Sequence, residues 1–174
     1  MAKVIKRIHF ITRIVTASVF LISFILFACN YKNMPADVGI HFGPDGNFDV
    51  RTLKTSIGWV FYPFIVSIAY IVLFELVNLF MPKTKLGLDM DENRANIIRS
   101  VIILWLDALR VIIVFFYSCI WGYAVSTQTQ LNVTLGQTFA ISMIVSMIAF
   151  ILYFGYMVIR YKPGKHKKEP ADDN

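Results

Sequence analysis

The chain has 174 residues, of which 57% are hydrophobic and only 16% are charged. Average soluble domains are about 45–50% apolar and about 25% charged, so this composition argues against an ordinary water-soluble domain. Lys and Arg outnumber Asp and Glu by 17 to 11, which leaves a formal net charge of +6. A basic excess of this size fits either a nucleic-acid-binding protein or a membrane protein, and the positions of the charges decide between the two.

Four apolar stretches of membrane length follow one another along the chain. About 20 apolar residues at 1.5 Å rise span a hydrocarbon core of roughly 30 Å. We therefore predict an all-α polytopic membrane protein with four transmembrane helices, at Ile14–Cys29, Trp59–Met81, Val101–Tyr123 and Phe139–Ile159. The first stretch follows basic residues and also resembles a signal peptide, which would make Cys29 a candidate for lipidation.

Basic residues fall almost entirely in alternate connecting segments. The segments 1–13, 82–100 and 160–174 hold thirteen Lys and Arg residues, whereas the segment 30–58 holds three. Because cytoplasmic segments carry the basic excess, we predict a protein of the cell membrane with both termini cytoplasmic. The basic tail is expected to contact anionic lipid, and nucleic acid is not an expected partner. The predicted parts are a basic N-terminus (1–13), a first helix pair (14–81) with an outer loop (30–58), a cytoplasmic loop (82–100), a second helix pair (101–159) and a basic tail (160–174).

Three ionisable residues, Glu75, Asp107 and Arg110, lie inside the predicted spans. A charged side chain at a helix centre costs roughly 2.5–3.5 kcal/mol on insertion scales, so each is expected to face a partner or water. Asp107 and Arg110 share one helical face, and Glu75 lies at a matching depth. We predict an intramembrane polar cluster of these three residues with Asn78. Its one uncompensated negative charge leaves open either a structural clamp between helices or a proton- or cation-coupled transporter.

The fourth predicted span carries a stripe of small residues, Ser142, Ser146 and Ala149, followed by Tyr153. Small residues let helix backbones approach closely in lipid. The stripe favours a packing face within the chain, and a homodimer seam or a packing subunit of a membrane complex are the alternatives. Cys29 and Cys119 both lie toward the outer ends of their spans, as inert packing residues or as a disulfide if the first and third helices touch there.

No nucleophile with a base, phosphate-binding glycine loop or zinc-ligand spacing occurs in the sequence, so we expect neither an enzyme nor a cofactor. The outer loop has its own pattern: Val38, Ile40 and Phe42 alternate as in a short strand, and the following Gly43–Gly46 predicts a tight turn. Four residues of this loop are candidate ligands for a divalent cation, although their spacing matches no established site: Asp37, His41, Asp45 and Asp49. The alternative is that the aspartates start turns and His41 bonds to the loop backbone.

This loop resembles the motif of a family of small bacterial membrane proteins of unknown function, whose domain also forms the N-terminal part of SdpI-type toxin-immunity proteins. The family pattern is a Pro, a hydrophobic stretch ending in His-Phe, then a Gly and an Asp, and the matching residues are Pro35, Val38, Ile40, His41, Phe42, Gly46 and Asp49. Lys54 resembles a basic residue that often follows, whereas Gly39 stands where the family commonly has Pro.

The resemblance covers about residues 29–82. It implies an immunity-type or envelope binding module that presents the outer loop to a secreted peptide or a membrane partner. Phe42 and Phe48 are the aromatic residues expected to be exposed on that loop.

Overall fold

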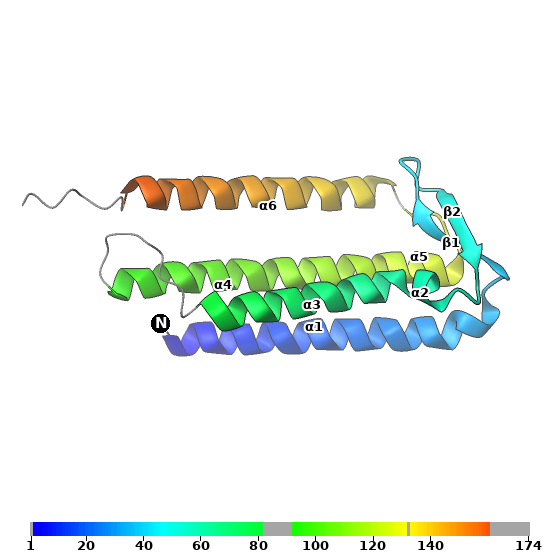
Figure 1. Ribbon diagram of the computed structural model, residues 1–174, viewed down its shortest axis with the longest axis horizontal. Coiled ribbons are helices and arrows are strands. Elements are labelled where there is room, and N and C mark those ends of the chain that lie inside the picture. The colour runs from blue at the N-terminus through cyan, green and yellow to red at the C-terminus, as the bar shows by residue number, and fades with distance from the viewer. Residues whose placement is uncertain (1, 82–91, 132, 161–174) are drawn as a thin grey trace, which may run out of the picture.

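The computed structural model describes residues 2–81, 92–131 and 133–160. The described chain is mostly helical, and long helical segments that follow one another in the chain run in opposite directions (Figure 1). These segments are α1 (Ala2–Asn30), α3 (Tyr62–Phe80), the continuous run of α4 (Glu92–Val114), the π-helical η3 (Phe115–Trp121) and α5 (Gly122–Thr127), and finally α6 (Val133–Arg160). α1 packs against α4, η3 and α5, and α3 packs against α4 and η3.

Among the described residues, three helical stretches are long and apolar enough to cross a membrane: Arg7–Asn33, Tyr62–Phe80 and Val133–Met157. Apolar side chains on their outer surfaces are exposed, including Leu26 at 65% and Leu152 at 67%. In water such surfaces would be costly, whereas lipid solvates them. The three stretches overlap the first, second and fourth predicted spans, and they are consistent with a membrane protein.

Two helices extend beyond the apolar stretches that predicted them. α1 begins at Ala2, so the basic segment 1–13 is helical from residue 2 onward. α4 begins at Glu92, so residues 92–100 belong to a helix and not to a loop. Residues 82–91 of that predicted loop, and the tail after Arg160, lie outside the described residues. Hydropathy locates the hydrocarbon-matched part of a helix, and the backbone ladder goes on into the polar region.

The segment between α1 and α3 contains a β-hairpin, so the all-α prediction was incomplete. After a short 3-10 turn, η1 (Tyr31–Asn33), β1 (Asp37–Phe42) pairs antiparallel with β2 (Phe48–Leu53), and α2 (Ile57–Val60) follows. The predicted strand is present, but Val38, Gly39 and Ile40 are all buried and strict alternation is lost. Gly39 departs from the alternation because the ring of Phe48 packs over it, and the pairing is irregular only after Gly39.

The hairpin covers one end of the helical bundle, opposite the end where α1 begins (Figure 1). One core cluster joins it to the helices, and the buried members are Phe27, Met34, Val38, Ile40, Val60, Phe64 and Val125. The ring of Phe27 lies 4.9 Å from the rings of both Phe61 and Phe64, edge to face. Apolar side chains from α1, β1, α2, α3 and α5 therefore meet in this cluster, which fixes where the hairpin sits.

α6 lies beside α4 and apart from the other helices (Figure 1), and large side chains bridge the space. Trp105 stacks on Phe150 with ring centroids 4.3 Å apart and donates a hydrogen bond of 2.9 Å to the hydroxyl of Ser146. Ser142 and Ala149 are exposed. The prediction of a close-packed small-residue face within the chain was therefore wrong, because aromatic and Met side chains hold the two helices apart.

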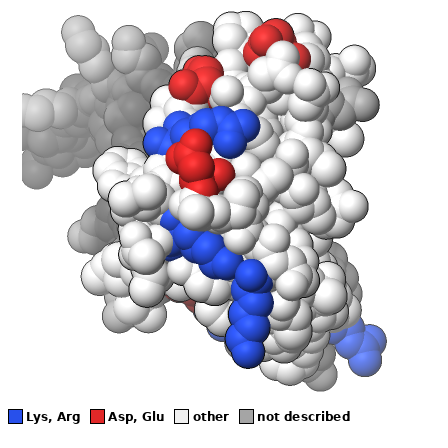
Figure 2. Space-filling model, turned by 90° about the vertical axis from the view of Figure 1, so that its right-hand side faces the viewer, with Lys and Arg blue, Asp and Glu red and all other residues white. Residues whose placement is uncertain are grey.

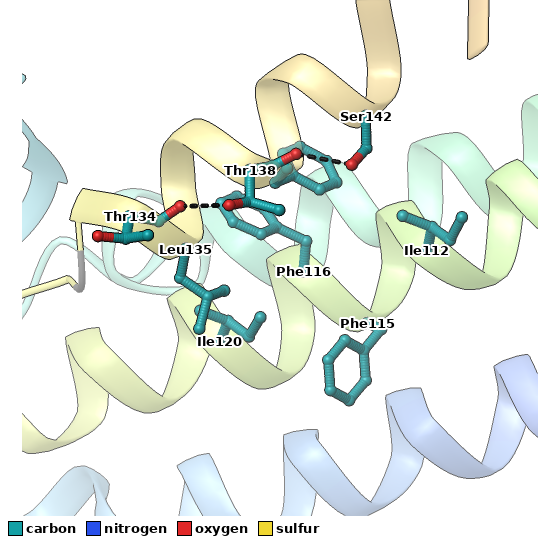
Figure 3. A pocket seen from close by; sticks show the side chains of 9 residues that line it. Ile112, Phe115, Phe116, Ile120, Thr134, Leu135, Thr138 and Ser142 are labelled. Atoms are coloured by element: carbon teal, nitrogen blue, oxygen red, sulfur yellow. Dashed lines mark hydrogen bonds between the residues drawn. The ribbon is translucent and has the colours of Figure 1, made fainter. Parts of the chain in front are cut away.

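A groove of about 410 Å³ opens between α6 and the α4–η3 segment (Figure 3). Its lining is mostly aliphatic and aromatic, with Phe116 stacked on Phe139 at 3.8 Å. The hydroxyls of Thr138 and Ser142 each donate a 2.7 Å hydrogen bond to a carbonyl one turn earlier in α6. The groove is largely apolar, and these two hydroxyl groups bond within their own helix.

Candidate functional site

The outer edge of β1 is occupied by two side chains from the end of the α4–η3–α5 run. Gln128, which has left-handed backbone angles (φ 54°), accepts a hydrogen bond from the N–H of Gly39 at 2.8 Å and donates one to the C=O of Gly39 at 3.3 Å. The indole N–H of Trp121 donates to the carbonyl of Ile40 at 3.1 Å. The side-chain amide of Gln128 thus makes the hydrogen bonds that a neighbouring strand would make, and these bonds attach β1 to the helical bundle.

The tip of the hairpin is fastened to the segment that precedes α6. Gly46 has a positive φ of 77°, and a Cβ there would lie 2.2 Å from the carbonyl oxygen of Leu131. Leu131 in turn donates its N–H to the carbonyl of Gly46 at 2.9 Å, and Gln130 donates to the side chain of Asn47. Only glycine tolerates both the positive φ and the close approach of Leu131, which explains why glycine stands at position 46 of the outer-loop motif.

Lys54 connects the end of β2 to the segment that precedes β1, at the base of the hairpin. Its ammonium group donates to the carbonyls of Lys32 at 2.9 Å and Met34 at 3.0 Å, and it lies 5.1 Å from the centroid of the Tyr31 ring. The Tyr31 hydroxyl donates to the carbonyl of Lys54 at 2.7 Å. An ammonium group with three donors suits this closure, because the last turn after α1 leaves carbonyls without helical partners.

The expectation that Phe42 and Phe48 are exposed was wrong. Both are half-buried, and their rings lie 4.3 Å apart. Phe42 also contacts Trp121 edge to face at 5.7 Å, and the Phe48 ring occupies the space that a Cβ on Gly39 would need, at 2.2 Å. The departure of Gly39 from the family pattern thus coincides with a ring packed over the bare backbone. Of the other motif residues, Pro35 is exposed, whereas Val38 and Ile40 are in the core.

The four candidate cation ligands are divided among separate contacts. Nδ1 of His41 lies 2.6 Å from Oδ1 of Asp49 across the hairpin, and Asp37 lies 3.8 Å from Arg51. Asp45 accepts hydrogen bonds from the side chain of Asn47 at 2.7 Å and from its N–H at 3.1 Å, and these bonds lower the pKa of Asp45. Within the described ranges, no three His, Cys, Asp or Glu residues are grouped so that they could hold a metal ion.

Figure 2 looks onto this end of the molecule, where acidic and basic side chains lie next to one another on a surface that is otherwise uncharged. The paired arrangement fits turn-forming aspartates and a bonded His41 better than a cation site. It also leaves a surface on which opposite charges already neutralise each other.

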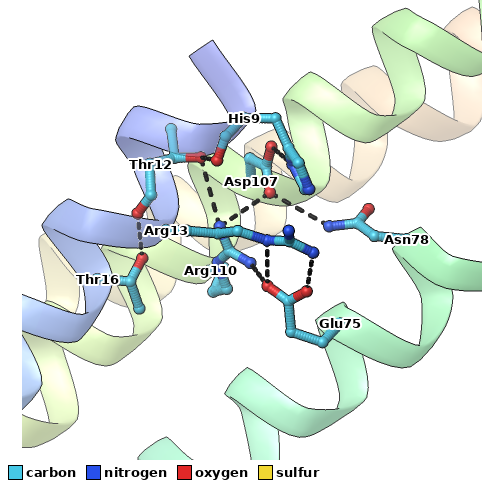
Figure 4. Close-up of polar contacts among 8 residues, drawn as sticks. All are labelled: His9, Thr12, Arg13, Thr16, Glu75, Asn78, Asp107 and Arg110. Carbon is cyan, nitrogen blue, oxygen red and sulfur yellow. Dashed lines mark hydrogen bonds and ion pairs between the residues drawn. The ribbon is translucent and has the colours of Figure 1, made fainter. Parts of the chain in front are cut away.

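The four residues of the predicted polar cluster meet between α3 and α4 toward the other end of the bundle (Figure 4). Nη2 of Arg110 lies 3.1 Å from Oδ1 of Asp107, and Nδ2 of Asn78 donates to the same oxygen at 3.2 Å. Nη1 of Arg110 donates to Oε1 of Glu75. Asp107 and Arg110 are almost wholly inaccessible, at 0% and 1% exposure. The carboxylates of both helices thus converge on one buried guanidinium group.

Sequence reasoning missed three further members, all on α1 (Figure 4). Nδ1 of His9 lies 2.5 Å from Oδ2 of Asp107. Arg13 grips Glu75 with two nitrogens, and its Nε lies 3.0 Å from Oε1. The hydroxyl of Thr12 accepts from Arg110 at 3.3 Å. The signal was present in the spacing, because positions 9, 12, 13 and 16 fall on one face of a helix.

Arg13 changes the charge of the cluster. With it, two guanidinium groups face two carboxylates, so the negative charge left over in the prediction has a partner on α1. Arg13 is half-exposed and Glu75 one-third exposed, and they border two hollows of about 260 and 510 Å³ between α1 and α3. Among the described residues, two buried polar atoms of the cluster lack a hydrogen-bond partner, Oδ1 of Asn78 and Nε of Arg110.

The two cysteines do not pair with each other. Sγ of Cys119 lies 3.0 Å from the hydroxyl of Ser23, and both Cys29 and Cys119 are free thiols. The alternative of a disulfide between them was wrong, because Cys119 meets α1 about two turns before Cys29.

Comparison of the chain with protein-family models found no match, and searches among curated proteins and among solved structures found none either. The resemblance of the outer loop to the immunity-protein domain therefore rests on the residues that carry it.

Proposed function

We propose that all four antiparallel segments cross the cell membrane, with the hairpin outside the cell and both termini in the cytoplasm. α4, η3 and α5 form the remaining span, and the two charged residues deep within it, Asp107 and Arg110, are paired. Paired charges that face a bundle interior are the usual way in which a membrane span tolerates them.

The charges support the same orientation. The hairpin end carries three basic and three acidic residues, namely Lys32, Arg51, Lys54, Asp37, Asp45 and Asp49. Arginines mark the ends of the helices that lie away from the hairpin, including Arg94 and Arg160. Because basic residues are retained on the cytoplasmic side, a neutral hairpin end fits the outside of the cell.

The protein is, on this proposal, a non-enzymatic binding module of the immunity type, and the hairpin is its binding element. The carrying observation is that the hairpin is fastened at its tip, at its β1 edge and at its base while side chains such as His41, Val50 and Leu53 stay exposed. A surface held in one conformation loses little entropy on binding. This is the property expected of a module that captures a secreted peptide.

The transport alternative is less well supported by the geometry. It depended on one uncompensated negative charge inside the membrane, and Arg13 supplies the missing positive charge. Four charged side chains that neutralise one another across three helices are better explained as a clamp. The one-third exposure of Glu75 is the remaining observation on the transport side.

The proposal is tested by growth of the native cell after deletion of the gene, in medium conditioned by the undeleted strain. We expect the deletion to inhibit growth and the intact chain to restore it. A double variant, His41→Ala with Leu53→Asp, should insert normally and fail to restore growth. Thr55→Ala is the matched control, because Thr55 is exposed at the same end but lies outside both strands. Full growth of the deletion strain, or full rescue by the double variant, would contradict the proposal.

A further inference from the structure

The two edges of the hairpin are not equivalent. The outer edge of β1 is filled by Gln128 and Trp121. The sheet has only the strands β1 and β2 among the described residues, so no strand lies against the outer edge of β2. We propose that this edge of β2 binds the secreted peptide in an extended conformation, as a third strand of the sheet. This inference rests on the proposed function and names the form of its ligand.

The register shows which backbone groups point outward. Lys54 donates its N–H to the carbonyl of Ala36 at 2.8 Å, which makes these two residues a hydrogen-bonded pair. Bonded and non-bonded pairs alternate along an antiparallel ladder. The pair Gly39 and Arg51 is therefore non-bonded, and the N–H and C=O of each point away from the other strand.

Gly39 confirms this alternation, because its two outward groups are the ones that Gln128 binds. On the opposite side, the N–H and C=O of Arg51 face outward, together with the N–H of Leu53. The carbonyl of Leu53 already accepts the N–H of Ser56 at 2.8 Å. A donor, an acceptor and a second donor thus stand in a row, which is the pattern that an added strand requires.

The surroundings of this edge indicate what the added strand carries. The charged side chains beside it are already paired, Arg51 with Asp37 and Asp49 with His41. Val50 and Leu53 are exposed at 47% and 64%. Six residues of β2 extend over about 20 Å, enough to pair with a segment of five or six residues. Because Val50 and Leu53 are three positions apart, they lie on opposite faces of the strand. The edge therefore fits an uncharged extended segment with apolar side chains on either face.

β2 carries only part of the usual protection of an exposed edge. Natural sheets block their edges with charged side chains, proline, bulges or very short strands. Phe48–Leu53 is six residues long and has no proline, and its two charged side chains, Asp49 and Arg51, are paired with His41 and Asp37 of β1. The register is irregular on both strands near the tip, where Ile40 of β1 and Asp49 of β2 are left out of the pairing, whereas Arg51, Thr52 and Leu53 pair in regular register. The regular part of the β2 edge, from Arg51 to Leu53, is therefore open to an added strand, whereas the β1 edge is filled by Gln128 and Trp121.

Proline at position 51 tests the proposal, because its missing N–H is one that faces outward and no bond between β1 and β2 is lost. The comparison variant is Arg51→Ala, which removes the same side chain and keeps the N–H. Both are assayed for growth of the deletion strain in conditioned medium, with membrane insertion and thermal unfolding measured alongside. We expect Arg51→Pro to tolerate about tenfold less conditioned medium than Arg51→Ala, since a backbone hydrogen bond is lost and the ring blocks the incoming strand.

A second pair of variants, Leu53→Pro and Leu53→Ala, repeats the test at the second outward N–H. This pair replaces the first if Arg51→Pro unfolds at a lower temperature than Arg51→Ala. Equal rescue by the proline and alanine variants would overturn the edge proposal while leaving the binding module intact. Absence of rescue by the unmodified chain would instead remove the proposed function itself. If the intact chain is a dimer in nanodiscs and Arg51→Pro a monomer with full rescue, the edge pairs with a second copy and the peptide proposal is wrong.

Discussion

Asp107→Asn removes one negative charge from the centre of the buried cluster with almost no change in volume. Asp107 is 0% exposed and contacts His9, Asn78 and Arg110. Before the change, the guanidinium groups of Arg13 and Arg110 balance two carboxylates; after it, the cluster has a net charge of +1. Removal of one partner from a buried ion pair costs about 3–5 kcal/mol, because the other charge stays buried.

Three further variants, Arg13→Gln, Arg110→Gln and the double variant Asp107→Asn with Arg110→Gln, allow this cost to be compared with that of an exposed pair. Arg13→Gln also removes one charge, but Arg13 is 47% exposed, so its loss should cost about 1 kcal/mol or less. The double variant Asp107→Asn with Arg110→Gln restores neutrality. It should be less destabilised than the two single variants added together, with an interaction energy of about 1–3 kcal/mol.

The assay is equilibrium unfolding of the full chain in detergent micelles. The free energy of unfolding is compared among the unmodified chain, the single variants Asp107→Asn, Arg13→Gln and Arg110→Gln, and the double variant. A loss below about 1 kcal/mol for Asp107→Asn would place its cost in the range of an exposed pair and refute the buried clamp. Strict additivity in the double variant would show that Asp107 and Arg110 do not depend on each other.

Two predictions concern the hairpin. Gly39→Ala should lower the free energy of unfolding by about 1–3 kcal/mol, because its Cβ would lie 2.2 Å from the Phe48 ring. Gly58→Ala is the control, because nothing lies within 4 Å of a Cβ at that position. A loss for Gly39→Ala no larger than that for Gly58→Ala would contradict the prediction. The lowered pKa of Asp45 means that its bonds to Asn47 stabilise the tip above the ordinary value of 3.8 and fade as the pH falls through the folded-state pKa. Amide exchange at Asn47 should accelerate over that pH range, and Asp45→Asn should remove the pH dependence.

Hydropathy and helical spacing predicted the apolar helices. They also predicted that polar side chains of α3 and α4 meet inside the bundle. Glu75 and Asp107 could be matched because charges are rare inside a span and their depths agreed. Arg13 was missed because it was counted with the basic residues that orient the chain. A residue near the end of a span can do both, since a long side chain reaches back to a buried partner while its helix marks the cytoplasmic side.

Pairing in the hairpin was harder to predict than the single strand β1. β1 has apolar side chains that enter a core, whereas Phe48–Leu53 is exposed at four of its six positions and has no apolar face to mark it. For α6 the helix itself was predicted, but the face through which it packs was not. Its small residues were visible, but whether a helix packs through Ser142 or through Phe139 depends on the partner surface, which the sequence of one helix does not contain.

The π-helical η3 connects the two ends of the molecule through the rotation of one segment. A π-turn uses hydrogen bonds to the fifth residue and takes in an extra residue, so everything after it is rotated by about 100° relative to a continuous α-helix. Before η3, Asp107 and Arg110 face α1 and α3. At the end of η3, Trp121 faces β1, and Gln128 after α5 does so too. In a continuous α-helix that kept Asp107 and Arg110 facing α1 and α3, Trp121 and Gln128 would be rotated away from the hairpin. The edge of β1 would then have no hydrogen-bond partner from this segment. The fold therefore needs the wide turn at this point, because one run of helix must place a charged face at one end and a strand-binding face at the other.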